Sequence, residues 1–154
     1  MTLPLKRGDA SSEPSPTRVL IELEIPSDVR YIERVVEVVT RHCLELRFNA
    51  RHCSLNVPVA LTEALSNAIL RGNEESPHKM VRIRAEVSAE RLVVDIVDQG
   101  EGFELGTCLR DPTSPANLLR EDGRGLFLMT RLMDQIERYT EGGNVVRMVL
   151  RRHD

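Results

Sequence analysis

Two β-rich runs separated by only four residues constrain the fold of this chain most strongly. Residues 80–87 and 92–97 are rich in valine and isoleucine, and residues 88–91 between them read SAER. Runs of this length and composition are typical of strands. Parallel strands need a connection of a dozen or more residues, so a connection this short predicts an antiparallel hairpin.

A second hairpin is predicted near the end of the chain. Residues 135–139 and 145–150 are two further β-rich runs, and they meet at Gly142-Gly143-Asn144. Glycine and asparagine tolerate the positive φ angles that tight hairpin turns require. The chain therefore contains at least two antiparallel strand pairs.

Helices are predicted between and before these hairpins. Residues 18–25 alternate as a first strand that ends at Pro26, and the apolar residues of 32–39 then recur at spacings of three and four, as on a helix with one buried face. A second helix follows Pro58 and stops at Gly72-Asn73. Residues 126–133 indicate a third.

This order of elements indicates the fold class. A strand, two helices, a strand pair, a helix and a second strand pair allow the helices to cover one face of a mostly antiparallel, mixed sheet. We therefore expect an α+β two-layer sandwich. Residues 103–122, with Gly106, Pro112 and Pro115, form a long connection of the kind that serves as a lid or binding loop.

Length and charge restrict the function classes. The chain has 154 residues, 41% of them hydrophobic, which fits one domain with a substantial core. Its formal charge of −3 gives no basic footprint for a nucleic-acid backbone, so no direct nucleic-acid partner is expected. The sequence shows no run of about 20 apolar residues and no signal-peptide pattern, so we expect a cytoplasmic protein without membrane attachment.

The first 17 residues differ in composition from the rest. Serine and proline dominate residues 11–16, and no large apolar side chain follows Leu5 in this segment. Such a segment cannot bury enough surface to offset the entropy lost on ordering. We expect residues 1–17 to be a disordered tail and residues 18–151 to form the domain.

The three cysteines, Cys43, Cys53 and Cys108, are odd in number and form no disulfide framework. The repeated His-Cys pairs at 42–43 and 52–53 raise the alternative of a zinc site. Adjacent side chains on a helix point about 100° apart, however, which disfavours convergence on one metal. Reduced thiols are the simpler interpretation.

Glu63 and Asn67 form the first candidate site motif. They lie four residues apart on the second predicted helix, which places them on one face about 6 Å apart along its axis. An isolated pair of this kind is usually a solvated polar stripe. Here apolar neighbours such as Leu61, Leu65 and Ile69 leave little of the helix for a purely solvated face, so the pair is expected to line a cleft.

Asp98 opens a second motif, DQGEG, at the end of a predicted strand. Aspartate before glycines is ordinarily a turn former. In the functional alternative, Gly100 and Gly102 let the backbone approach a flat base, and the carboxylate accepts hydrogen bonds from an exocyclic amine.

Gly123 and Gly125 form a third motif, GRG, at the entry of the helix that starts at Leu126. Backbone N–H groups at a helix start favour a phosphate, although the alternative is a flexible hinge. Arg124 either adds charge to the phosphates or points to solvent. The spacing fits neither a Walker A loop nor a dinucleotide-binding fingerprint.

Taken in order, the three motifs resemble the N, G1 and G2 boxes of the GHKL ATP-binding superfamily. The GRGLFLM segment and the domain size are most similar to bacterial anti-sigma-factor serine-protein kinases of the RsbW/SpoIIAB-like group. The resemblance covers about residues 18–151 and implies the Bergerat ATP-binding fold. One departure is Arg71-Gly72, where the family often has His-Gly, and Arg71 is given no role.

The resemblance implies a role for each motif. Asn67 takes the position of the magnesium ligand, Glu63 that of the catalytic carboxylate, and Asp98 that of the residue that reads adenine. The remaining nucleotide-binding positions are Gly100, Gly102, Gly123, Arg124, Gly125 and Leu126.

The resemblance also implies partners. A kinase of this kind uses ATP and Mg²⁺, phosphorylates a serine or threonine of a STAS-domain anti-sigma-factor antagonist, sequesters a sigma factor and forms a homodimer. Two alternatives remain: a module that binds ATP and sequesters a partner without turnover, and a partner-switching kinase with an output other than a sigma factor.

Overall fold

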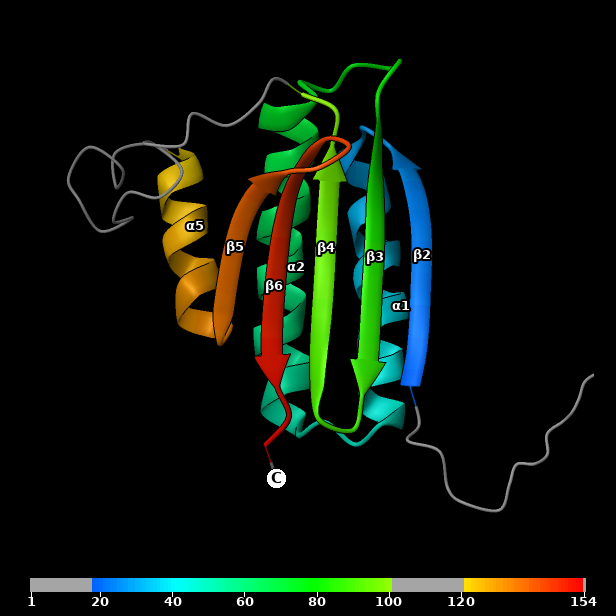
Figure 1. Cartoon of the computed structure of the whole chain (residues 1–154), viewed down its shortest axis with the longest axis vertical. Helices are drawn as coiled ribbons and strands as arrows, with labels where there is room; N and C mark the ends of the chain where they lie inside the picture. Colours follow the sequence, from blue (N-terminus) through cyan, green and yellow to red (C-terminus); the bar gives the residue numbers. More distant parts are fainter. Residues whose placement is uncertain (1–17, 101–120, 154) are drawn as a thin grey trace, which may run out of the picture.

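A five-stranded antiparallel sheet organises the protein (Figure 1). The computed structural model describes residues 18–100 and 121–153, so the predicted tail, Cys108, Gly102 and most of the predicted lid lie outside the described residues. The sheet order is β2-β3-β4-β6-β5. The strands are β2 (Arg18–Pro26), β3 (Met80–Ser88), β4 (Arg91–Asp98), β5 (Gln135–Thr140) and β6 (Asn144–Arg151).

Both predicted hairpins are present. In β3 and β4 the register pairs Val87 with Leu92, and in β5 and β6 it pairs Thr140 with Asn144. Each of the four strand pairings in the described residues is antiparallel, so the sheet is more uniform than the mixed sheet we expected. At the second turn Gly142 and Gly143 have φ of +67° and +137°, which a side chain would strain.

In the described residues, three α-helices cover one face of this sheet, and no helix lies on the other face (Figure 1). They are α1 (Ile32–Glu45), α2 (Val57–Ser66) and α5 (Glu121–Leu132). Alternate residues of β3 and β4 are buried on the helix side, as the period of two requires. The core lies between the two layers, so the predicted α+β sandwich is confirmed.

The central helix begins earlier than the sequence indicated. The chain is helical from Ala50, and a π-helical segment, His52–Asn56, leads into α2. We predicted a start at Pro58, because proline is typical of a first helical turn. The wider π-helical turn accommodates the proline ring and its missing N–H group, so the helix continues through it. A second π-helical segment, Asn67–Gly72, ends the helix.

The composite helix His52–Gly72 is also long and apolar enough to cross a membrane by length and composition, which the sequence analysis had not recognised. The core helix of a globular domain meets the same criteria, and this helix packs between the sheet, α1 and α5. One such helix is weak evidence for a membrane span.

The third helix also starts earlier than predicted. The described part of α5 already includes Glu121, ahead of the predicted start at Leu126, so Gly123 and Gly125 lie within the helix and not before it. Glycine has a low helix propensity, which is why the sequence placed the boundary after it. Tertiary packing overrides this preference, because Gly125 is buried against the central helix.

Two of the cysteines lie in the described residues. Cys43 and Cys53 are both buried and both free thiols. Burial raises the pKa of Cys43 to about 12, so it is protonated at neutral pH and packs as a small apolar side chain.

Candidate functional site

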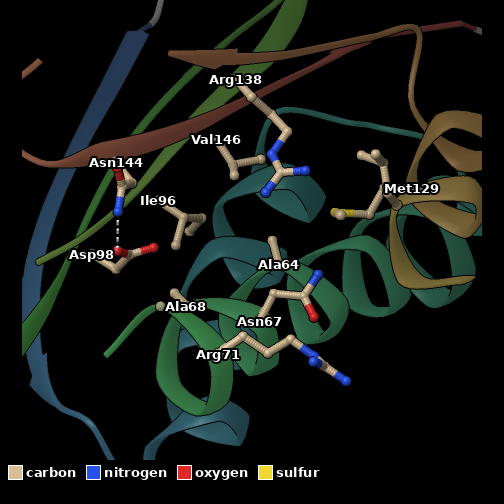
Figure 2. Close-up of a pocket in the computed structure, with 12 residues that line it drawn as sticks. Ala64, Asn67, Ala68, Arg71, Ile96, Asp98, Met129, Arg138, Asn144 and Val146 are labelled. Carbon is tan, nitrogen blue, oxygen red and sulfur yellow. Dashed lines mark hydrogen bonds between the residues drawn. The ribbon is translucent and has the colours of Figure 1, made fainter. Parts of the chain in front are cut away.

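A cavity of about 150 Å³ lies between the central helix, the inner face of the sheet and α5 (Figure 2). Cavities of roughly this volume take one small aromatic ring. Its apolar lining comes from all three of these elements: Ala64, Ala68, Ile96, Leu126, Met129 and Val146. Charged and amide side chains from the helix and the strands complete the walls, so a flat, partly polar ring suits this space.

Asp98 lies at one end of the cavity, at the end of β4. Its side chain is only 5% exposed. The backbone N–H of Gly100 and the side-chain Nδ2 of Asn144 both donate to its Oδ1 atom, at 2.8 Å and 2.9 Å. Because both bonds end on one oxygen, Oδ2 remains as an acceptor for a ligand in the cavity that Asp98 lines.

Two glycines bring the chain close together at this end. A Cβ atom on Gly72 would overlap the carboxylate of Asp98, and a Cβ atom on Gly100 would overlap the backbone carbonyl of Gly72. The end of the central helix and the loop after β4 therefore touch through their backbones. The close approach explains the glycines at positions 72 and 100.

The environment of Asp98 perturbs its acidity. Burial raises the pKa of the carboxyl above its ordinary value, and the hydrogen bonds from Asn144 and Gly100, together with the positive charge of Arg138, offset part of that rise. A buried carboxylate that keeps one acceptor oxygen for a ligand is typical of a recognition group.

Asn67 lines the other end of the cavity, and Glu63 and Gly125 lie next to it. Glu63 and Asn67 lie on consecutive turns of the central helix, and both are half-buried. A Cβ atom on Gly125 of α5 would lie 2.8 Å from Oε1 of Glu63 and 3.4 Å from Nδ2 of Asn67. The first and third sequence motifs, about 60 residues apart in the chain, are therefore in contact.

The side chain of Asn67 suits a magnesium ion. Among the described residues, no three His, Cys, Asp or Glu side chains converge as a metal cage. Magnesium is usually held by one or two protein groups together with phosphates and water, so a full cage is not required. Asn67 supplies a carbonyl oxygen, which fits that pattern, and leaves the carboxylate of Glu63 for a role other than metal binding.

Sequence reasoning missed two arginine positions in the cavity wall. Arg138 of β5 lies opposite Val146 in the strand register and points into the cavity, as Figure 2 shows. Arg71 of the central helix lines the opposite wall. The available signal was the alternation of β5, in which Ile136 and Arg138 occupy inward positions. Two guanidinium groups favour an anionic ligand.

Asn144 was also missed as a site residue, because its position in a Gly-Gly-Asn turn has an adequate local explanation. The structure shows that its side chain is 2% exposed and bonded to Asp98. Only the pairing of Asp98 with Asn144 across β4 and β6 brings the two together.

The remaining predicted residues are placed in part. Leu126 lines the cavity. Gly123 and Arg124 lie within α5, whereas we predicted that they precede it. Gly102 lies outside the described residues.

The chain belongs to the histidine kinase-like ATPase domain family, whose model matches residues 25–150. The match runs from the end of β2 to β6 and so includes both ends of the cavity. The predicted resemblance to the GHKL ATPases is thereby confirmed, together with the use of ATP that the family implies.

Within this ATPase family, the chain is similar to anti-sigma factors and serine-protein kinases. The chain is 32% identical over 99 residues to an anti-sigma F factor of Clostridium beijerinckii, covering 63% of this chain and 68% of that protein. It is 28% identical over 141 residues to the serine-protein kinase RsbW of Staphylococcus epidermidis, covering 86% and 87%. It is 26% identical over 133 residues to RsbW of Bacillus subtilis, covering 83% and 82%.

Proposed function

We propose that this protein is an ATP- and Mg²⁺-dependent serine/threonine protein kinase that acts as an anti-sigma factor. The observation that carries the proposal is the convergence of three sequence motifs on one cavity. Asp98, Asn67 and Leu126 line the cavity, and Glu63 and Gly125 lie together next to Asn67. The names of the relatives support the same assignment.

Adenine recognition is assigned to the Asp98 end. The amino group of adenine donates to the remaining oxygen, Oδ2, while the ring lies on the apolar side chains of Ile96 and Val146. Guanine carries a carbonyl oxygen at the position of that amino group, and this oxygen would face the carboxylate. The site therefore selects ATP over GTP.

The phosphates are assigned to the opposite end. The first turn of α5 supplies backbone N–H groups and the positive end of the helix dipole. Asn67 is the residue that holds magnesium, which when bound neutralises phosphate charge and aligns the γ-phosphate. Arg71 adds a positive charge on the same side of the cavity.

Glu63 is assigned to the transfer step. The serine hydroxyl oxygen of the protein substrate attacks the γ-phosphorus, and the bond from that phosphorus to the oxygen bridging to the β-phosphate breaks. Glu63 orients the hydroxyl and accepts its proton, and ADP leaves with the bridging oxygen. Positioning and charge neutralisation supply most of the acceleration in reactions of this kind.

Partner exchange follows from this chemistry. The substrate is a STAS-domain antagonist, which in its unphosphorylated form competes with a sigma factor for the kinase. Phosphorylation lowers the affinity of the antagonist, so the kinase then holds the sigma factor. We assign the protein to the cytoplasm as a homodimer without membrane or nucleic-acid contacts.

The testing experiment measures ATP binding by calorimetry with and without magnesium, and then ³²P transfer from ATP to the co-encoded antagonist. The wild type should bind ATP in a magnesium-dependent manner and phosphorylate the antagonist. Asn67→Ala should lose both activities, and Thr62→Ala, an exposed change on the same helix, should keep both.

Three outcomes contradict parts of the proposal. Near-normal magnesium-dependent binding by Asn67→Ala would remove this residue as the metal ligand. ATP binding without transfer to any antagonist would indicate a module that sequesters its partner without turnover, and transfer to an antagonist unlinked to a sigma factor would indicate a different output.

A further inference from the structure

Asn73, the residue at the end of the central helix, is fully buried and uses its side-chain amide on three different segments. Its exposed fraction is 0%. Its Nδ2 group donates to Oγ of Ser27 at 2.9 Å and to the carbonyl of Met80 at 3.0 Å. Its Oδ1 atom accepts from the backbone N–H of Gln99 at 2.7 Å. Sequence reasoning had assigned it only a helix stop.

The bond to Gln99 is the one that reaches the nucleotide cavity. Gln99 follows Asp98 directly, and Gly100 comes next, with its backbone against the carbonyl of Gly72. Residues 72 and 73 therefore hold residues 98–100 by a backbone contact and a side-chain hydrogen bond. The side chain of Gln99 returns to the framework, because its Oε1 accepts from the N–H of Met80 at 2.6 Å.

We propose that Asn73 is a positioning residue for nucleotide recognition. Its hydrogen bond to Gln99 fixes the backbone of residues 98–100, so that Oδ2 of Asp98 is positioned to accept a hydrogen bond from a ligand in the cavity. Asn144 of β6 holds the carboxylate itself. The inference rests on the proposed function, since it concerns the same base-reading end. Asn73 acts through the loop and not through contact with the nucleotide.

The nitrogen and the oxygen of the Asn73 amide bond to different parts of the molecule, which allows the positioning role to be tested separately from a purely structural one. The Nδ2 group bonds to Ser27 and Met80, which are framework contacts away from the cavity. The Oδ1 atom bonds to the base-reading loop. Ser27 itself donates to the carbonyl of Lys79 at 2.6 Å, so its loss weakens the framework while the loop contact remains.

The test compares Asn73→Ala with the matched control Ser27→Ala in the full-length protein. Amide hydrogen exchange by NMR measures the protection of the Gln99 N–H group, and calorimetry measures affinity for ATP and GTP with magnesium. In Asn73→Ala we expect exchange at Gln99 to be about tenfold faster or more, because the acceptor is lost. ATP affinity should fall by about tenfold, with a smaller ATP-over-GTP preference.

The control separates loop position from general stability. Ser27→Ala should lower the thermal unfolding temperature but keep ATP affinity and Gln99 exchange within about twofold of wild type, because the Asn73 contact to the loop is intact. Asn73→Asp is a second variant for the case in which Asn73→Ala does not fold. It keeps an acceptor for Gln99 and should keep its N–H protected.

Three results would overturn the proposal. Unchanged Gln99 exchange in Asn73→Ala would show that the side chain does not hold the loop. Equal losses of ATP affinity in Asn73→Ala and Ser27→Ala would reduce its role to stability. If the wild type binds ATP and Asn73→Ala binds it equally well, the positioning role alone fails, whereas no ATP binding by the folded wild type overturns the proposed function as well.

Discussion

The two ends of the cavity are built differently. At the Asp98 end, to which we assign base recognition (the base-reading end), the backbone segments of Gly72 and Gly100 are in direct contact. The buried amide of Asn73 bonds to the loop after β4, and that of Asn144 bonds to the carboxylate of Asp98. At the opposite end, to which we assign phosphoryl transfer (the catalytic end), the half-buried side chains of Glu63 and Asn67 face Gly125 of α5.

This difference supports our assignment of base recognition to the Asp98 end and of phosphoryl transfer to the Glu63 end. A site formed by interlocked backbone has little freedom to adapt, so it selects a ligand by fixed hydrogen-bond geometry. A site formed by flexible side chains can follow a phosphate that moves during the reaction. Changes at the first end should therefore affect selectivity and stability, and changes at the second should affect the transfer rate.

The largest effect is expected from Glu63→Gln at the catalytic end. The amide cannot accept the hydroxyl proton, so the rate of phosphoryl transfer should fall by about 100- to 10,000-fold. ATP affinity should stay within about twofold of wild type, because the residues assigned to adenine and the proposed magnesium ligand, Asn67, are unchanged. Single-turnover ³²P transfer and calorimetry measure the two quantities. A fully active variant would remove Glu63 from the mechanism.

Asp98→Asn should have the next largest effect, on selectivity. The amide oxygen can still accept from Gly100 and Asn144, but an NH₂ group then replaces the acceptor in the cavity. ATP affinity should fall by about 10- to 100-fold as a charged hydrogen bond is lost, and GTP should gain relative to ATP. Competition calorimetry with both nucleotides measures the ratio. An unchanged ratio would show that the base is read elsewhere.

Gly100→Ala tests the rigidity of the base-reading end. The added Cβ atom overlaps the Gly72 carbonyl, and neither backbone segment can move without disturbing its own hydrogen bonds. We expect the free energy of unfolding to fall by about 1–3 kcal/mol, as for other overpacked sites. Urea denaturation measures this. No loss of stability would show that the contact is soft.

Gly125→Ala is the matched change at the catalytic end. Its Cβ atom meets Oε1 of Glu63 at 2.8 Å, the movable tip of a side chain, and alanine favours a helix over glycine by about 1 kcal/mol. Stability should therefore hold or rise, while displacement of Glu63 lowers the transfer rate by about tenfold. A loss of stability as large as that of Gly100→Ala would erase the distinction between the two ends.

The smallest effect is a pH dependence. Because burial raises the pKa of Asp98 above the ordinary 3.8, protonation removes the acceptor as pH falls through the raised value, and ATP binding weakens. The same raised pKa means that the contribution of Asp98 to stability is present below about 3.8 and is lost as pH rises through its folded-state pKa. Asp98→Asn should therefore be more stable than wild type at neutral pH.

Calorimetry across pH tests whether ATP binding weakens as pH falls, and thermal unfolding across pH tests whether the stability contribution of Asp98 is lost as pH rises. Asp98→Asn is the control, because it shares the titration of the ATP phosphates but lacks the carboxyl group. Equal pH dependence of binding in wild type and variant would place the titrating group outside Asp98.

Much of the fold could be predicted because its signals are local. The alternation in residues 80–87 and 92–97 predicted the hairpin of β3 and β4. The spacing of Glu63 and Asn67 placed both on one helix face, and the glycine motifs pointed to close backbone approaches. Such periodicities follow from the geometry of single elements.

The misplaced boundaries had tertiary causes. The central helix continues through Pro58 because a π-helical turn precedes that residue. The helix α5 includes Gly125 because that residue packs against Glu63 of the central helix. A local rule reads proline and glycine as boundaries, since both have low intrinsic helix propensity. Packing energy summed over neighbouring elements outweighs that preference.

By itself, the sequence determined the main helices and strands, the α+β class and the family, and it predicted the residues to which we assign the chemistry. The tertiary structure decided which of them meet: Asn144 with Asp98, Gly125 with Glu63, and Asn73 with the loop after β4. Periodic patterns depend on a few consecutive residues, whereas these contacts join positions that lie 26 to 62 residues apart in the chain. Only the pairing of the strands and the packing of the helices on the sheet bring such positions within hydrogen-bonding or van der Waals distance.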